Sequence, residues 1–303
     1  MKTIIGITGA SGMLGKHLLH ILSKKKISVV ATSKRLIRSK NKNIIWKKLN
    51  LIDLKNESQL DNVFGNINTI VHIGALVPKA NIKQDKKKIK KINFDSTLII
   101  TKWALKKNIH LIYISGAIIY ENKGKKKIKE ISNLKTKFFK DFYGSSKKKC
   151  DLYLQKKIKS GNKISILRPS SIYGFGLDKN KIINQLIKLS KSNKDIRLYG
   201  PFDKINLIHA IDVAEAIYKT IVKKKYKIFN IGSNKLYSIK DLSKILIKIN
   251  KSKSKLKIKK NMNISNIDYK YNISSLEAKK NLQWSSKVSI INGVKLLMQK
   301  KYG

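Results

Sequence analysis

The sequence predicts an α/β protein with a doubly wound, mostly parallel sheet. Two observations predict this class. Strand-like apolar runs alternate with helical segments through the first half of the chain, which is the pattern of a parallel sheet with helices on both faces. The first apolar run also leads through three glycines straight into a helical segment. Sheets of this kind use such a turn to hold a phosphate group.

The expected strands and helices follow one another in order along the first half of the chain. The expected strands are 4–8, 28–32, 44–49, 69–73, 110–115 and 163–168. The expected helices are 16–24, 93–107 and 143–160. Because ligands bind beyond the carboxyl ends of the strands in such sheets, we expect the functional site at that edge.

The turn after the first strand contains glycines at positions 9, 12 and 15. Gly9 can adopt the positive φ of a tight turn, Gly12 lets a pyrophosphate approach the backbone, and Gly15 lets the helix lie close to the strand. A glycine triplet alone also marks ordinary turns, but its place between a strand and a helix favours a Rossmann-type dinucleotide site. The expected contacts are those of Gly9, Ser11, Gly12, Met13, Leu14 and Gly15.

After Pro169 the alternation becomes less regular. The expected elements are a loop at 173–176, a helix at 181–191, short strands at 205–210 and 228–231, and further short helices in the tail. The sequence therefore predicts a dinucleotide-binding domain at 1–170, to which 206–232 returns, and a smaller C-terminal substrate lobe formed mainly by 171–303.

The composition of the 303 residues is that of a globular protein, with 42% hydrophobic residues and three prolines. A single cysteine, Cys150, excludes an internal disulfide framework and fits a reducing compartment. No apolar stretch approaches the roughly 18 residues of a membrane span, and no secretory leader is recognisable. These features predict a cytoplasmic protein without membrane insertion, and no metal site is expected.

The formal net charge of +51 allows two interpretations. One is a protein that binds nucleic acid or an anionic membrane surface. The other is a composition biased toward lysine, and the distribution favours it: arginine occurs at only four positions, and lysine is spread over the whole chain. Because arginine is the usual residue for bidentate phosphate and base contacts, no specific nucleic-acid binding is expected.

Tyr143 and Lys147 lie four residues apart in an expected helix. Residues at this spacing share a helix face at roughly 5–6 Å. A lysine cation about 5 Å from a phenol stabilises its ionised form by about 3 kcal/mol, or about two pKa units, at an effective dielectric constant of 20. Since lysine is abundant here, the pair alone could be incidental, and it gains meaning from the glycine turn.

The chain resembles the extended short-chain dehydrogenase/reductase family, the NAD(P)-dependent epimerases, dehydratases and reductases. The similar segments occur in the family's order and are TGASGMLG at 8–15, VHIGALV at 71–77, NFDST at 93–97, YGSSK at 143–147, LRPSSIYG at 167–174, LIHAIDVA at 207–214 and FNIGS at 229–233. Seven segments in register make the resemblance specific.

The resemblance implies a role for each matching residue. Tyr143 would be the acid/base acting on a substrate hydroxyl or keto oxygen, while Lys147 would bind the nicotinamide ribose and lower the tyrosine pKa. Asn93 would lie near the active site as a substrate contact. The other implied contacts are Asn50 and Leu51 with adenine, Ile73, Gly74 and Ala75 with the cofactor ribose, Pro169 with nicotinamide, and Ser170 with the substrate.

The chain departs from the family pattern after its fifth expected strand. Gly116 occupies the position of the usual Ser or Thr. Ser115 is a candidate catalytic substitute, although adjacent strand residues face opposite ways. Either the strand end rearranges, another hydroxyl serves, or activity is reduced or lost. Ala117 and Ile118 replace the acidic residues of the family's dehydratases, which disfavours a 4,6-dehydratase and leaves epimerisation or keto-sugar reduction.

The end of the second strand bears on cofactor choice. NAD-preferring members usually have an acid there for the ribose 2′-hydroxyl, whereas this chain has Ser33, Lys34 and Arg35. A hydroxyl and two cations suit a 2′-phosphate, so NADP(H) is expected to be favoured over NAD(H).

The substrate end lacks the two arginines with which sugar-nucleotide members hold a diphosphate. Ile205 stands at the first position, beside Lys204, and the cations nearest the second are Lys259 and Lys260. Lysine offers a charge without the bidentate fork of arginine. Lys204 is therefore the expected substrate-binding cation.

These observations together predict an NAD(P)-dependent oxidoreductase or epimerase acting on a nucleotide-activated sugar. The family commonly dimerises through the helices expected at 93–107 and 143–160, so a homodimer is expected. The alternatives are a reductase of another carbonyl substrate, a non-catalytic dinucleotide-binding protein, and a basic nucleic-acid binder.

Overall fold

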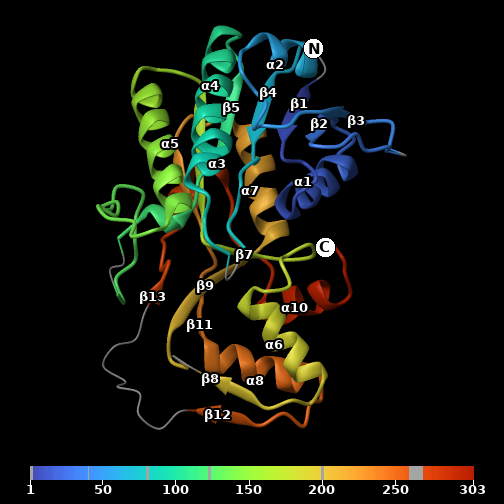
Figure 1. Cartoon of the computed structure of the whole chain (residues 1–303), viewed down its shortest axis with the longest axis vertical. Helices are drawn as coiled ribbons and strands as arrows, with labels where there is room; N and C mark the ends of the chain where they lie inside the picture. Colours follow the sequence, from blue (N-terminus) through green and yellow to red (C-terminus); the bar gives the residue numbers. More distant parts are fainter. Residues whose placement is uncertain (1–2, 40, 80–81, 122–123, 199–200, 259–268) are drawn as a thin grey trace.

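A seven-stranded parallel sheet forms the centre of the molecule, with the strand order β10-β6-β5-β4-β1-β2-β3 (Figure 1). The computed structural model describes residues 3–39, 41–79, 82–121, 124–198, 201–258 and 269–303. The sheet strands are β1 Ile4–Thr8, β2 Ser28–Ser33, β3 Ile44–Lys48, β4 Thr69–His72, β5 His110–Ile114, β6 Ile164–Pro169 and β10 Ile228–Ile231. The expected doubly wound parallel sheet is confirmed.

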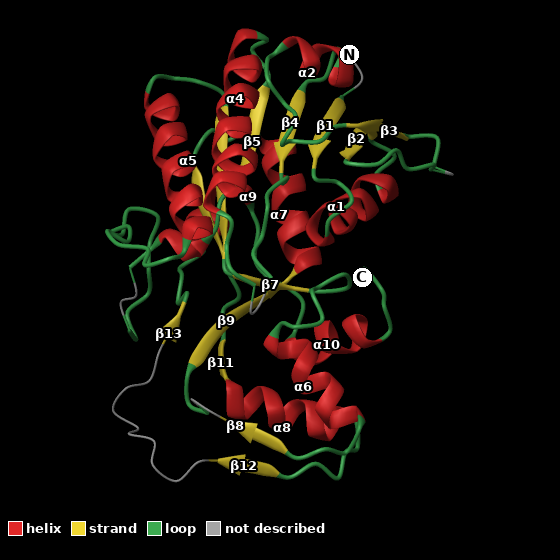
Figure 2. Cartoon of the chain, viewed as in Figure 1, coloured by secondary structure: helices red, strands yellow, loops and turns green. Residues whose placement is uncertain are grey.

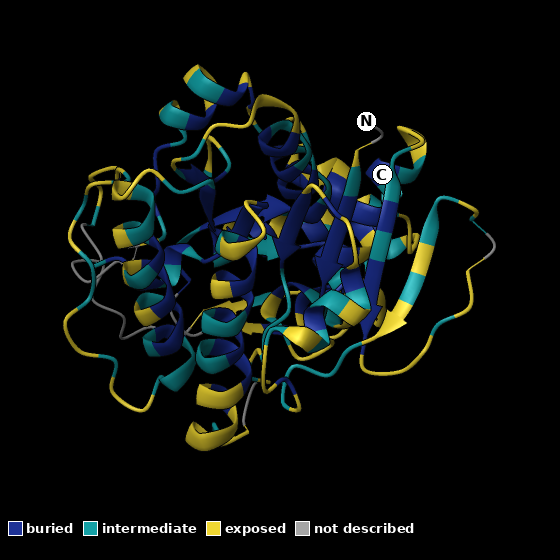
Figure 3. Cartoon of the chain, turned by 90° about the horizontal axis from the view of Figure 1, so that it is seen from above, coloured by how far each residue is buried: buried dark blue, intermediate teal, exposed yellow. Residues whose placement is uncertain are grey.

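Helices cover both faces of this sheet. One face packs against α1 (Met13–Lys24), α7 (Ala210–Lys223) and α9 (Leu276–Leu282). The other packs against α2 (Ser58–Phe64), α4 (Ser96–Lys106) and α5 (Phe142–Lys159). Seen from above, the inner strands of the sheet are buried, whereas the edge strand β3 is partly exposed (Figure 3). No helix of the described residues is long and apolar enough to cross a membrane.

A smaller lobe lies beyond the carboxyl ends of the sheet strands (Figure 2). It has an apolar core of its own, to which three helices contribute. The helices are α6 Ile182–Lys191, α8 Ile239–Ile249 and α10 Ile290–Met298. Its strands are β7 Ser171–Tyr173, β8 Ile196–Leu198, β9 Lys204–His209, β11 Leu236–Ser238, β12 Leu256–Ile258 and β13 Tyr269–Lys270. Strand β9 pairs with β7, β11 and β13, while β8 pairs with β12.

Three helical segments differ from the expectation. The expected helix at 93–107 is preceded by α3 (Lys86–Ile89) and by a π-helical turn, η1 (Lys90–Asp95), before α4 begins. Helix α2 was not expected, because its seven residues are too few for a helical repeat of apolar residues to be recognised. Helix α7 was also missed, although its buried apolar residues recur at helical spacing.

Candidate active site

A cavity of about 890 Å³ lies between the carboxyl edge of the main sheet and the smaller lobe. Its walls come from the glycine turn, from the segments that follow β2, β4, β5 and β6, from the start of α5, and from the smaller lobe. The cavity therefore occupies the edge at which the sequence predicts a ligand site.

The glycines of the turn let backbone segments lie closer together than side chains would allow. Gly9 has a φ of +69°, and a Cβ there would lie 2.6 Å from Cα of Gly74. A Cβ on Gly15 would lie 2.5 Å from the carbonyl oxygen of Gly9. Gly12 is the N-cap of α1 and provides no side-chain cap, so the first N–H groups of the helix remain for an anion.

Most residues of the glycine turn line the cavity, whereas Gly15 packs inside the protein. Gly9, Ser11, Gly12, Met13 and Leu14 line the cavity, as a cofactor-binding role requires. Gly15 is not a lining residue and serves the close packing of α1 on the turn. The residues present thus fit the phosphate end of a dinucleotide.

Helix α5 presents Tyr143 and Lys147 to the same cavity. The helix begins at Phe142, and Asp141 caps it by accepting a hydrogen bond from the Gly144 N–H at 2.9 Å. The side-chain oxygen of Gln84 accepts from the Tyr143 N–H at 2.9 Å. Two side chains therefore fix the first turn of α5 and, with it, the direction in which Tyr143 points.

Lys147 is buried and bonded to the strand end opposite it. Its ammonium group donates to the Ile114 carbonyl oxygen at 2.7 Å and lies 5.9 Å from the centre of the Tyr143 ring. Burial lowers the pKa of Lys147 to about 8. Burial is also the main cause that raises the pKa of Tyr143, ahead of the charges of Tyr271 and Asp141. Desolvation of the phenol thus opposes the lowering of the tyrosine pKa that was expected from Lys147.

Ser115 and Gly116 both line the cavity. Strand β5 ends at Ile114, and a 3₁₀ turn, η2 (Ala117–Ile119), follows. The alternation expected for a strand therefore does not separate these two residues, because the strand has ended before them. Ser115 is thus placed at the site, and its hydroxyl has no hydrogen-bond partner within the described residues. Pro169 and Ser170 line the same wall.

The part of the cavity next to β2 carries positive charge. Ser33, Lys34 and Arg35 line the cavity, and no carboxylate does so among the described residues. The Ser33 hydroxyl donates to the carbonyl oxygen of Arg35, which shapes this turn. Both cationic side chains are exposed at the rim.

The other residues expected to bind the cofactor also line the cavity. Asn50, Leu51, Ile73, Gly74 and Ala75 all line it. The Asn50 amide nitrogen donates to the carboxylate of Asp53 at 2.6 Å. The Asn50 amide oxygen is buried without a partner within the described residues and remains as an acceptor for a ligand.

Two predicted substrate contacts, Asn93 and Lys204, do not line the cavity. The Asn93 side chain accepts from the Leu76 N–H at 2.7 Å and donates to the hydroxyl of Ser146 at 3.2 Å. It therefore ties the segment after β4 to α5 instead of reaching a ligand.

Lys204 lies on β9 between the two lobes. Its strand neighbours Ile205 and Leu207 line the cavity, and alternate strand residues point to opposite faces. Lys204 therefore faces away from the cavity. Lys259 and Lys260 lie outside the described residues.

Sequence reasoning missed Lys181, which contributes a cation to the cavity wall from the smaller lobe. Lys181 is the N-cap of α6, and its side chain does not cap the helix. The expected helix included this residue, but nothing in the sequence distinguished it from the other lysines. No group of three metal-ligating side chains occurs among the described residues.

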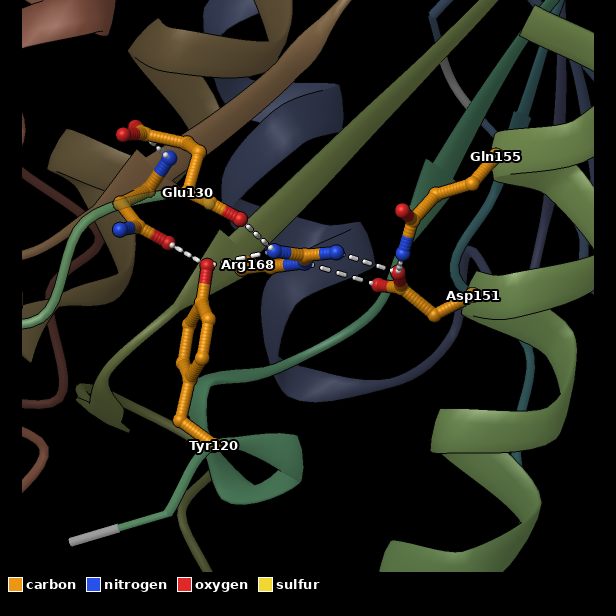
Figure 4. A network of polar contacts seen from close by, with 6 residues as sticks. Tyr120, Glu130, Asp151, Gln155 and Arg168 are labelled. Carbon is orange, nitrogen blue, oxygen red and sulfur yellow. Dashed lines mark hydrogen bonds and ion pairs between the residues drawn. The ribbon is translucent and has the colours of Figure 1, made fainter. Parts of the chain in front are cut away.

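A buried polar network next to the site was also not expected (Figure 4). The Arg168 guanidinium on β6 forms two hydrogen bonds with the Asp151 carboxylate of α5, at 2.5 and 3.0 Å. It also donates to the Tyr120 hydroxyl at 2.5 Å and to the Glu130 carbonyl oxygen at 2.8 Å. The network joins α5, which carries Lys147, to β6, the strand that ends directly before Ser170.

A family model described as NAD dependent epimerase/dehydratase family matches residues 5–232. This chain belongs to the NAD-dependent epimerase/dehydratase family. The expected resemblance to extended short-chain dehydrogenases/reductases is thereby confirmed, and the glycine turn, α5 and the strand ends all lie inside the matched part. A family of enzymes that depends on NAD agrees with a cavity whose glycine turn fits a dinucleotide phosphate.

Two curated relatives of this family member match at the level of sequence. The hybrid PKS-NRPS synthetase xenE of Xenoacremonium sinensis is 32% identical over 203 residues, which are 62% of this chain and 5% of that protein. A dTDP-D-glucose 4,6-dehydratase of Dictyostelium discoideum is 27% identical over 266 residues, 80% of this chain and 61% of that protein. The chain therefore spans less than two thirds of the length of either relative.

Solved structures of other family members have the same fold. A UDP-glucose 4-epimerase of Thermotoga maritima, solved with UDP-glucose, has a TM-score of 0.83 at 20% identity, and the match covers 98% of each chain. A dTDP-glucose 4,6-dehydratase of Bacillus anthracis, solved with NAD, has a TM-score of 0.82 at 18% identity over 98% of this chain and 96% of that one. At these identities the likeness shows the fold.

Proposed function

We propose that this family member is an NAD(P)-dependent oxidoreductase or epimerase that acts on a nucleotide-activated sugar, as a 4-epimerase or a keto-sugar reductase. The observation that carries the proposal is the opening of Tyr143 and Lys147 onto the same cavity as the glycine turn. This arrangement puts an acid/base beside a site that fits a dinucleotide.

The residues of α5 supply proton chemistry and binding. Because burial raises the pKa of Tyr143, the phenol carries its proton at neutral pH and is ready to donate it to a keto oxygen. Lys147 holds its place through Ile114 and offers its remaining N–H groups to ribose hydroxyls. The nicotinamide, when bound, supplies the hydride exchanged with the sugar carbon.

NADP(H) is the proposed cofactor. Support comes from Lys34 and Arg35 at the cavity rim and from the absence of a lining carboxylate among the described residues. A carboxylate would favour an unmodified ribose, whereas two cations attract a 2′-phosphate.

An epimerase or a reductase is favoured over a dehydratase by the residues that follow Gly116. Ala117 and Ile118 line the cavity and carry no acid or base. Elimination of water needs a group that removes a proton from carbon and one that protonates the leaving hydroxyl. Relatives that are named 4,6-dehydratases therefore do not decide the reaction of this chain.

For the diphosphate of a sugar nucleotide, Lys181 is the cation we propose, in place of Lys204. It lines the cavity beside the first residues of α6, whose N–H groups begin the helix without a side-chain cap. A charge and free N–H groups together suit a phosphate.

A second candidate function is reduction of a less polar carbonyl compound. The observation that favours it is the apolar wall that the smaller lobe contributes, formed by Leu177, Ile182, Ile183, Ile205 and Leu207. Turnover with nucleotide keto sugars and with uncharged ketones, measured side by side, separates the two candidates.

The test of the proposed chemistry is Tyr143→Phe, with turnover followed by NADPH absorbance and by sugar analysis. We expect the rate constant to fall by about 10²- to 10⁴-fold, since the acid/base is removed. Tyr153→Phe is the matched control, because Tyr153 lies on the same helix outside the cavity. Turnover of Tyr143→Phe near that of the unaltered enzyme would falsify the mechanism.

A further inference from the structure

Two buried hydroxyl groups in the cavity wall have no hydrogen-bond partner within the described residues. They belong to Ser115, which is 4% exposed, and Ser170, which is 6% exposed. Both residues line the cavity that Tyr143 and Lys147 also line. A buried hydroxyl without a partner costs roughly 1–3 kcal/mol, so two of them in one wall point to a ligand that supplies the partner.

The backbone holds both serines firmly in place. The Ser115 N–H donates to the Leu167 carbonyl oxygen at 2.8 Å, and the Ser170 N–H donates to the Ile231 carbonyl oxygen at 3.0 Å. These bonds extend the pairing of β5 with β6 and of β6 with β10. Each hydroxyl group is therefore carried by the residue directly after a strand, whose backbone is still hydrogen-bonded to the neighbouring strand.

Gly116 connects the surroundings of the two serines. A Cβ built on Gly116 would lie 4.0 Å from the carbonyl oxygen of Pro169, the residue that precedes Ser170. Ser115 directly precedes Gly116, and its other neighbour, Ile114, accepts the hydrogen bond of Lys147 at 2.7 Å. Ser115, Ser170 and the ammonium group of Lys147 thus all lie at the ends of the neighbouring strands β5 and β6.

We propose that Ser170 is a second catalytic residue, which together with Ser115 donates hydrogen bonds to the substrate oxygen that exchanges a proton with Tyr143. Two donors aimed at an oxygen that becomes negative stabilise the transition state. The serines form no covalent bond and neither gain nor lose a proton, since the proton moves between Tyr143 and the substrate oxygen. This proposal rests on the proposed function.

The experiment compares Ser170→Ala with the unaltered enzyme on a panel of nucleotide keto sugars. We expect kcat to fall by about 10- to 10²-fold with a much smaller change in KM, because the donor acts on the developing charge. The melting temperature should stay the same or rise, since the lost hydroxyl had no partner in the protein. NADPH affinity should not change.

A hydroxyl at position 116 provides the rescue. A Cβ there would meet no atom closer than 3.7 Å, and the extended backbone of Gly116 suits any residue. Gly116→Ser added to Ser170→Ala should raise kcat at least tenfold above that of Ser170→Ala alone. Gly116→Ala added to Ser170→Ala should not raise kcat. A merely structural role of Ser170 predicts equal results for the two.

The outcomes separate this proposal from the proposed function. If Ser170→Ala has an unchanged kcat while Tyr143→Phe is inactive, the proposed role of Ser170 is wrong and the proposed function stands. No turnover of the panel by the unaltered enzyme or by Gly116→Ser overturns both. Turnover by Gly116→Ser alone would show that the two serines do not form a working donor pair.

Discussion

Charge on single residues distinguishes the end of the cavity where we propose that the cofactor ribose binds from the rest of this lysine-rich surface. Lys34 and Arg35 line the cavity, while Arg38, three residues further on, is exposed and does not. Only a charge that reaches the bound phosphate can discriminate between the two cofactors, because exposed charges further away are screened by salt.

The first prediction concerns Arg35. Arg35→Ala should weaken NADPH binding roughly tenfold and leave NADH binding unchanged, because one charge-assisted contact with the 2′-phosphate is lost. Fluorescence titration of both cofactors measures the ratio. Arg38→Ala is the matched control and should alter neither affinity. Equal losses for NADPH and NADH would show that Arg35 contributes general attraction and does not select the cofactor.

Single residues also show where sequence reasoning succeeds and fails. That Tyr143 and Lys147 share one face of a helix could be predicted, because four-residue spacing within a helix is local geometry. Lys204 could not, since the direction of its side chain depends on the register of β9 in a second sheet. Ser115 faces the cavity because β5 ends one residue earlier than expected, and strand ends depend on tertiary contacts.

At the level of elements, side-chain contacts hold helix α5 at its first turn and at its middle. Asp141 and Gln84 fix its first turn, and the ion pair of Asp151 with Arg168 fixes its middle against β6. Removal of one partner from that buried pair would leave an uncompensated charge. The position of Tyr143 therefore depends on groups that do not touch the cavity.

The second prediction tests the helix cap. Asp141→Ala should lower stability by about 1 kcal/mol through loss of the cap, and should also lower kcat, because the first turn of α5 carries Tyr143. Ser289→Ala removes the cap of α10, where Ser289 accepts from the Asn292 N–H at 3.2 Å, and should lower stability alone. The two variants are compared by urea unfolding and turnover. An equal effect of both on kcat would contradict the specific role of α5.

Local elements were predictable and context-dependent ones were not. The first strand, the glycine turn and α1 follow from a contiguous pattern, so this wall of the cavity could be predicted from the sequence. The π turn at Lys90–Asp95 could not, because it has no period of its own. Helix α7 carried a signal that was overlooked: Val213, Ile217 and Ile221 recur at a spacing of four and are buried.

Dimerisation of the whole molecule through α4 and α5 stays a prediction. Lys102 and Lys149 are exposed on these helices, and Leu152 of α5 is 40% exposed.

The molecule combines a net charge of +51 with an interior that contains several uncharged histidines. The histidines bear more directly on stability, because their side chains are buried without carboxylate partners among the described residues.

Four histidines have pKa values that burial lowers from the ordinary 6.5. The pKa falls to about 3 for His72 and to about 4 for His110 and His209, and His17 shifts in the same direction. Unfolded histidines take up protons below pH 6.5, but the buried ones do not. Stability should therefore be complete above pH 6.5 and fall as the pH decreases, by up to about 1.4 kcal/mol per pH unit for each histidine.

The last prediction isolates one of these groups. His110 donates from Nε2 to the Ser165 hydroxyl at 2.8 Å, and that hydroxyl donates onward to the Lys225 carbonyl oxygen. Glutamine can keep the donor but does not titrate, so His110→Gln should reduce the slope of unfolding free energy against pH by about 1 kcal/mol per unit between about pH 5 and 6.5. Urea unfolding across that range measures both slopes. An identical slope in the two proteins would mean that His110 is protonated in the folded state, which the buried environment of its ring opposes.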